Sequence, residues 1–174
     1  MTYLIKAIFI VGALGLGACT NPDHLSGNGN ANGAGNGAGA GSNIPLDPAS
    51  DPTSPVYFSQ TIGDRVLFAV DTSTLTPEGR STLTAQAGWL QANPEYAAII
   101  EGHADEQGTR AYNLALGARR ANAVQEFLLS QGIAANRLRT LTYGKERPIE
   151  VCSAESCYAK NRRAVTVISA GAGA

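Results

Sequence analysis

The sequence of 174 residues predicts an α+β domain in which two helices pack on one face of a small mixed sheet, preceded by a tether. Apolar stretches with strand and helix periodicity follow one another in the order strand, helix, strand, helix, strand, strand. Half of the 20 glycines lie before residue 45, in about a quarter of the chain, so the composition changes sharply along the chain. We therefore assign residues 56–174 to one compact domain.

The first strand and the first helix are indicated by local signals. RVLFAV, residues 65–70, is apolar and contains β-branched residues, which predicts a strand. Thr76-Pro77-Glu78 combines a hydroxyl N-cap, a proline and an acid in the first turn, which predicts the start of a helix. Asn93-Pro94 predicts its end. We expect Trp89, which lies near the apolar stripe of this helix, to anchor the core rather than to stack on a ligand.

The remaining elements follow from periodicity. YAAIIEGH, residues 96–103, predicts the second strand, and the polar turn ADEQG follows it. An apolar stripe predicts a second helix over residues 109–130, with Gly132 as its stop signal. Alternating residues predict a strand over 137–144, and the last strand is predicted over 162–169.

Residues 1–18 have the pattern of an export signal. Lys6 is followed by the apolar run AIFIVGALGLGA, which is shorter than the stretch of about 20 residues needed to span a bilayer. The alternative is an ordinary signal peptide in which Cys19 is incidental. The stretch from Leu16 to Cys19 resembles a bacterial lipobox, which implies that Cys19 becomes the acylated N-terminus. Thr20 stands where aspartate often marks inner-membrane retention, so the resemblance implies the outer membrane.

Residues 19–55 are predicted to form the lipidated N-terminus and a linker. Residues 26–42, SGNGNANGAGNGAGAGS, are a low-complexity stretch that cannot bury a core, and residues 43–55 are rich in proline. A flexible chain of about 35 residues has a root-mean-square span of roughly 30 to 35 Å. The composition therefore indicates a flexible spacer rather than a segment that binds a specific partner.

An acid and a base are predicted to flank the turn after the second strand. Asp105 lies in that turn, and Asn113 and Arg120 are seven positions apart on the second helix, so they share a face. A guanidinium suits a carboxylate and an aspartate suits an ammonium, so these residues could bind a zwitterion. The alternative is a direct Asp105–Arg120 salt bridge that tightens the loop, contributing roughly 0 to 1 kcal/mol.

Three motifs resemble the OmpA-like peptidoglycan-binding family. They are GHADEQGTRAYNLALGARRANAV, YGKERP and AKNRRAV, and the resemblance extends from about Val66 to Val167. It implies the family's α+β fold and non-covalent binding, without a cofactor, to the meso-diaminopimelate of peptidoglycan stem peptides. The free end of that residue is a zwitterion, so the resemblance favours ligand binding over the internal salt bridge.

The resemblance also implies a role for each site residue. Asp105 would hold the ammonium, Arg120 the carboxylate, and Asn113 would help through its amide. Asp71, at the family's FD-type position, would contribute mainly through backbone groups, although valine replaces the usual aromatic residue before it. Arg163 would reach the site.

The neighbouring Arg162 should point to the opposite side of the strand from Arg163. The sequence leaves open which of the two arginines faces the ligand.

Composition and resemblance bound the partners. The net charge of −1 excludes a basic nucleic-acid binder. Lipoprotein members of the family also engage the Tol machinery, chiefly TolB. The resemblance therefore implies a tether between the outer membrane and the cell wall that supports envelope integrity and cell division. The alternative is an adaptor whose main role is binding TolB.

The cysteines and the lone histidine of the domain are predicted to be structural. Cys152 and Cys157 are five residues apart, and in an oxidising compartment we expect a local disulfide rather than a metal site, which usually takes four ligands. His103 is expected to hydrogen-bond a turn. No nucleophile elbow, P-loop or zinc-protease motif occurs, so we predict that the protein is not an enzyme.

Overall fold

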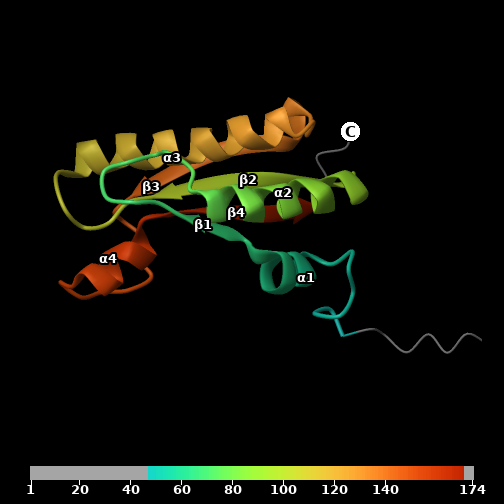
Figure 1. Cartoon of the computed structure of the whole chain (residues 1–174), viewed down its shortest axis with the longest axis horizontal. Coiled ribbons are helices and arrows are strands. Elements are labelled where there is room, and N and C mark those ends of the chain that lie inside the picture. Colours follow the sequence, from blue (N-terminus) through green and yellow to red (C-terminus); the bar gives the residue numbers. More distant parts are fainter. Residues whose placement is uncertain (1–46, 171–174) are drawn as a thin grey trace, which may run out of the picture. The chain divides into compact units, whose positions relative to one another are not determined.

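Four strands form one mixed sheet in the computed structural model, which describes residues 47–170 (Figure 1). They are β1 (Arg65–Leu67), β2 (Tyr96–His103), β3 (Leu138–Gly144) and β4 (Arg163–Ala170), and their order in the sheet is β1-β4-β2-β3. β4 is antiparallel to both of its neighbours, whereas β2 and β3 are parallel. The predicted α+β class with a small mixed sheet is confirmed.

The predicted signal segment, residues 1–18, lies outside the described residues, as do Cys19 and the linker as far as residue 46. Within residues 47–170, no helix combines the length and the apolar character that crossing a membrane requires.

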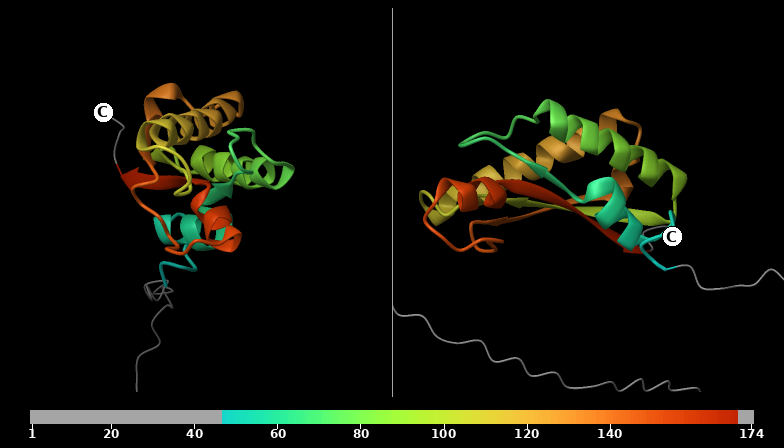
Figure 2. Two further views of the ribbon diagram at one scale, coloured as in Figure 1. Left: turned by 90° about the vertical axis from the view of Figure 1, so that its left-hand side faces the viewer. Right: turned by 60° about the horizontal axis from the view of Figure 1, so that its bottom comes forward.

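Two long helices lie on the same face of the sheet, as predicted (Figures 1 and 2). They are α2 (Pro77–Ala92) and α3 (Arg110–Ser130). Thr76 and Thr109 are their N-caps, and each hydroxyl oxygen accepts a hydrogen bond from the backbone N–H three residues further on. Both helices therefore start within one residue of the prediction, which used the cap and proline signals for α2 and the apolar stripe for α3.

The hydrophobic core lies between these helices and the sheet. Trp89 belongs to it, as predicted: its indole ring lies 4.9 Å from the Phe58 ring and 5.3 Å from the Tyr96 ring. The indole N–H donates to the Pro52 carbonyl oxygen at 2.7 Å. Pro52 thus contacts the core although the sequence places it in the linker. The fully buried apolar side chains include Leu83, Leu90, Ile100, Val124 and Leu128.

Two glycines allow the α3 backbone to touch the sheet. A Cβ atom at Gly102, on β2, would lie 1.9 Å from the carbonyl oxygen of Gly117 on α3. A Cβ atom at Gly117 would lie 2.4 Å from Oγ1 of Thr142 on β3. Any side chain at either position must push helix and sheet apart. The two glycines therefore set how deeply α3 sits on the sheet, and with it the depth of every residue on that helix face.

Several short elements differ from the sequence prediction. Helix α1 (Pro55–Tyr57), the π-helical turn η1 (Phe58–Gly63), the 3-10 turn η2 (Ala135–Arg137) and helix α4 (Glu155–Asn161) were not predicted. Each is shorter than the window of roughly 11 to 18 residues over which helical periodicity can be recognised. Strand β1 is also shorter than the predicted residues 65–70, because the chain turns away after three residues.

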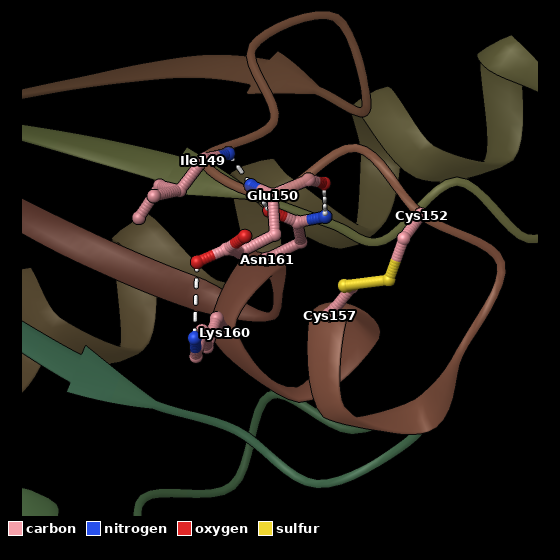
Figure 3. The surroundings of a disulfide bond; sticks show 6 residues. All are labelled: Ile149, Glu150, Cys152, Cys157, Lys160 and Asn161. Atoms are coloured by element: carbon pink, nitrogen blue, oxygen red, sulfur yellow. Dashed lines mark hydrogen bonds and ion pairs between the residues drawn. A yellow bond between two sulfur atoms is a disulfide. The ribbon is translucent and has the colours of Figure 1, made fainter. Parts of the chain in front are cut away.

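The segment between β3 and β4 is held by α4 and a disulfide (Figure 3). Cys152 and Cys157 are joined, with their Cα atoms 6.0 Å apart. The fully buried Asn161 accepts hydrogen bonds at Oδ1 from the N–H groups of Ile149 and Glu150, and its Nδ2 donates to the Glu150 carbonyl. The Asn161 contacts therefore join the two ends of the segment, and the disulfide closes a ring between them.

Candidate ligand-binding site

A cavity of about 230 Å³ lies beyond the end of β2. Its walls come from the loop after β1, the loop after β2 and the first two turns of α3. Two carboxylates and two amide residues line it together with apolar groups, so it suits a small ligand with a positive charge. The lining residues are Val70, Asp71, Asp105, Gln107, Gly108, Tyr112, Asn113 and Leu116.

Asp105 lies two residues after β2 and lines the cavity, although it is only 7% exposed. Its Oδ1 accepts the backbone N–H of Gln107 at 3.2 Å. Its Oδ2 accepts from Nη1 of Arg162 at 3.2 Å. The direct salt bridge to Arg120 considered from the sequence is absent, because the partner of Asp105 is a different arginine.

Asp71 faces the same cavity from the loop after β1. Its φ angle of 55° lies in the left-handed region. Residues other than glycine rarely adopt this region, although Asp and Asn do so more often than most. The Tyr112 hydroxyl donates to its Oδ1. The backbone N–H groups of Val70 and Asp71 have no acceptor within residues 47–170. Because Val70 and Asp71 both line the cavity, the loop brings a carboxylate and these two N–H groups to its wall.

Asn113 also lines the cavity but is almost fully buried, at 1% exposed. Its Nδ2 donates to the carbonyl of Gln107 at 2.7 Å. The amide therefore joins α3 to the loop after β2. In this structure its main contact is with the protein, and it shapes the wall that carries Asp105.

Arg120 is not a lining residue, and this corrects the geometry inferred from helix spacing. It is fully buried, and its guanidinium donates to the carbonyls of Thr72 at 2.9 Å, His103 at 2.8 Å and Ala69 at 3.1 Å. It also lies over the Phe68 ring, 5.2 Å from the centroid. Arg120 thus ties the loop after β1 to the end of β2, behind the cavity.

The charge of Arg120 persists in this setting. Burial lowers its pKa to about 10, an effect that the carboxylates of Asp105 and Asp71 oppose. The side chain therefore stays protonated at neutral pH and places a positive charge behind the cavity.

Arg162, rather than Arg163, reaches the site. Arg162 donates to Asp105, whereas Arg163 donates to the carbonyls of Asn161 at 3.3 Å and Arg147 at 3.1 Å. Arg163 begins β4, next to the core residue Ala164, so alternation along the strand turns its side chain to the face away from the helices. The prediction that Arg163 contacts the ligand does not fit this geometry.

His103 makes no hydrogen bond to a turn, contrary to the prediction. Its ring is 2% exposed, stacks on Tyr143 with centroids 5.5 Å apart, and has no hydrogen-bond partner at either nitrogen. Burial, with the positive charges of Arg163 and Arg147, lowers its pKa to about 4. The Glu101 carboxylate, 3.8 Å away, would favour a charged ring, but burial outweighs it. His103 is therefore a neutral packing residue.

Sequence reasoning missed several residues at the site. Gln107, Gly108 and Tyr112 line the cavity, and Glu155 on α4 shares Arg162 with Asp105. Tyr112 carries a signal that could have been used, because it lies one helical turn before Leu116, which shares the predicted face of Asn113 and Arg120. Within residues 47–170, no group of three or more His, Cys, Asp or Glu side chains is placed to hold a metal ion.

The chain matches a family model and named relatives. The model described as the OmpA family matches residues 67–162. The peptidoglycan-associated lipoprotein of Brucella melitensis is 53% identical over 125 residues, which cover 72% of this chain and 74% of the relative. That of Mesorhizobium japonicum is 54% identical, with the same coverage.

Solved structures agree. The peptidoglycan-associated lipoprotein from Burkholderia pseudomallei has a TM-score of 0.62 and 34% identity, covering 71% of this chain and all of that one. The C-terminal domain of Helicobacter pylori MotB, 22% identical, has a TM-score of 0.58 over 63% of this chain and 86% of that one, and it supports the fold alone. This chain belongs to the OmpA family and, within it, to the peptidoglycan-associated lipoproteins.

Proposed function

We propose that the protein binds peptidoglycan without catalysis, by holding the free zwitterionic end of meso-diaminopimelate in the cavity. The observation that carries this proposal is that two carboxylates, Asp71 and Asp105, line one small cavity beside backbone N–H groups that lack acceptors. At about 230 Å³ the cavity is smaller than a typical drug-sized site, so it suits one end of an amino acid better than a sugar. The names of the relatives, which associate those proteins with peptidoglycan, support a ligand from the cell wall.

Each group has a chemical role in this proposal. Asp105 and Asp71 accept hydrogen bonds from the ligand ammonium. The N–H groups of Val70 and Asp71 donate to its carboxylate, and the buried charge of Arg120 favours the same end of the ligand. Asn113 acts through the wall that it braces. Arg120 uses three of its five guanidinium N–H groups on backbone carbonyls and is fully buried, so it would contact the ligand directly only if the surrounding loops moved.

The proposal extends to the place of the protein in the envelope. Acylated Cys19 would anchor the chain in the outer membrane, with the domain facing the periplasm and residues 20–46 between anchor and domain. TolB and other Tol components, and a part in cell constriction, belong to the proposal through the family resemblance.

Co-sedimentation with purified sacculi tests the ligand. We expect binding to walls with meso-diaminopimelate and weak binding to walls with lysine, which lacks the terminal carboxylate. Asp105→Asn removes the charge at constant shape and should weaken binding at least about tenfold, since losing one partner of a close charge pair costs about 2 to 5 kcal/mol. Glu106→Gln, on the same loop but exposed, is the matched control. Equal binding to both walls, or full binding by Asp105→Asn, would contradict the proposal.

The same sedimentation separates binding from catalysis. After incubation, a binding protein leaves the supernatant free of wall fragments, whereas a hydrolase releases soluble muropeptides. Fragments that accumulate with time and with protein concentration would show that the protein is an enzyme.

A further inference from the structure

Two acids share one arginine beside the candidate site. Glu155 binds the Arg162 guanidinium through both carboxylate oxygens, one to Nη2 and the other to Nη1 at 3.5 Å. Asp105 receives a single bond, from Nη1 at 3.2 Å. Glu155, which does not line the cavity, thus makes the bidentate contact with Arg162, and Asp105, which lines the cavity, makes the single hydrogen bond.

Arg162 cannot easily leave this position. Its backbone N–H donates to Tyr158, its carbonyl accepts from the Phe68 N–H at 2.9 Å, and its Nε donates to the Phe68 carbonyl at 3.2 Å. It is 5% exposed, whereas the Glu155 side chain is 64% exposed. The guanidinium is therefore a fixed group, and Glu155 is the movable one of its two acidic partners.

We infer that Glu155 is a positioning residue for the proposed site, an inference that rests on the proposed function. By binding the fork of Arg162, Glu155 offsets its charge and keeps it from gripping Asp105 with two bonds. The arginine then compensates the charge of Asp105 only in part, and free lone pairs remain for the ligand ammonium. Without Glu155, Asp105 would be the only acidic partner of the fixed guanidinium, and a rotation of the Asp105 side chain would form the stronger two-bond arginine–carboxylate pair.

The disulfide sets the position of Glu155. Glu155 lies between Cys152 and Cys157, inside the ring that their bond closes. It begins α4, which has only seven residues and no side-chain cap at Ala154. A helix of that length is marginal by itself in water, so it needs the ring and the Asn161 contacts to hold its shape (Figure 3). Opening the ring should loosen the grip of Glu155 on Arg162.

The test compares two stem peptides by calorimetry. One carries meso-diaminopimelate, and the other carries 2-aminopimelate at the same place, which keeps the distal carboxylate but lacks the distal ammonium. The ratio of their dissociation constants measures how far the protein prefers the ammonium. We expect Glu155→Gln to lower this ratio about fivefold to tenfold, within the usual range of coupling between neighbouring groups. The loss should come from weaker binding of the diaminopimelate peptide alone.

Matched variants identify the cause. Glu150→Gln removes another acid of the same segment, one that pairs with Lys160, and should leave the ratio unchanged. Glu155→Asp should retain part of the wild-type ratio that Glu155→Gln loses. The double change Cys152→Ser and Cys157→Ser should lower the ratio in the wild-type background and have no further effect beside Glu155→Gln.

The outcomes separate the two proposals. If the wild-type protein binds neither peptide, the proposed function fails. If it prefers the diaminopimelate peptide and Glu155→Gln retains that preference, or weakens both peptides equally, the function stands and the positioning role of Glu155 is refuted.

Discussion

Replacing Arg120 by methionine tests whether this residue holds the frame of the site. Arg120 is fully buried, and its guanidinium binds three backbone carbonyls on two segments that are far apart in the sequence. Methionine keeps much of the apolar length of the side chain but donates no hydrogen bond. The variant therefore leaves the packing near Phe68 largely filled and removes the contacts that join the loop after β1 to β2.

The expected cost follows from these contacts. A buried acceptor that loses its partner costs about 1 to 3 kcal/mol, so three carbonyls give about 3 to 9 kcal/mol. Removing a buried charge returns part of that amount, and breaking buried ionic contacts typically costs about 3 to 5 kcal/mol. We therefore expect Arg120→Met to lower the free energy of unfolding by about 4 kcal/mol. Arg120→Lys keeps the charge but not the fork, and should lose about half as much.

Urea unfolding followed by fluorescence measures this loss, because Trp89 is the single tryptophan and lies in the core. With a slope of about 1.5 kcal/mol per molar urea, the midpoint should fall by about 2 to 3 M. Arg119→Met is the matched control, because Arg119 directly precedes Arg120 on α3 but is exposed. This variant should change the free energy of unfolding by less than about 0.5 kcal/mol. If Arg120→Met costs less than about 1 kcal/mol yet abolishes wall binding, the reasoning is refuted and Arg120 acts mainly as a ligand contact.

Two further predictions concern the packing. Gly117→Ala places a methyl group 2.4 Å from a β3 hydroxyl oxygen and should destabilise by about 1 to 3 kcal/mol, whereas Gly88→Ala meets nothing within 4 Å and should stabilise α2 by about 0.5 to 1 kcal/mol; thermal melts that rank them otherwise would contradict the glycine contact. Because the pKa of His103 is lowered from 6.5 to about 4, the unfolded chain takes up the proton first as the pH falls. The contribution of neutral His103 to the free energy of unfolding is thus fully present above about pH 6.5 and declines by about 3 kcal/mol toward pH 4. Unfolding measured at several pH values should show a shallower decline for His103→Gln than for the wild type. An equal decline in both proteins would count against this role of His103.

The long elements could be predicted because their periodicity and caps are local properties. Helix α3 was predicted over residues 109–130 and is observed at Arg110–Ser130, and β2 was predicted at its observed bounds. Helix α4 could not be found in this way. Its seven residues are held by the disulfide and by the side chain of Asn161, and these contacts depend on the finished segment rather than on a pattern.

The sequence predicted which helix face carries the site residues, but not how deeply those residues are buried. Helical spacing correctly put Asn113 and Arg120 on one face of α3. It could not reveal that the contact between Gly102 and Gly117 lowers the helix onto the sheet, where Arg120 meets backbone carbonyls instead of the cavity. A direct side-chain pair with Asp105 was the natural inference from charge alone.

The sequence left open which of the two neighbouring arginines faces the ligand, for a related reason. Alternation of side chains applies inside a strand, and β4 begins only at Arg163. Arg162 caps the end of α4, so its direction follows from the helix end and from its bonds to Phe68. Because the predicted strand begins one residue too early, the direction of Arg162 could not be inferred from strand alternation.

The place of β4 in the sheet has a consequence for how the chain is made. The last strand in the sequence lies between the first strand and β2, and it provides the partner for each of them. A nascent polypeptide that still lacks residues 163–170 leaves β1 unpaired and one edge of β2 open. Premature stops near the end of the coding region would therefore yield fragments with bare strand edges, which are prone to aggregation and open to proteases, rather than a slightly shortened working protein.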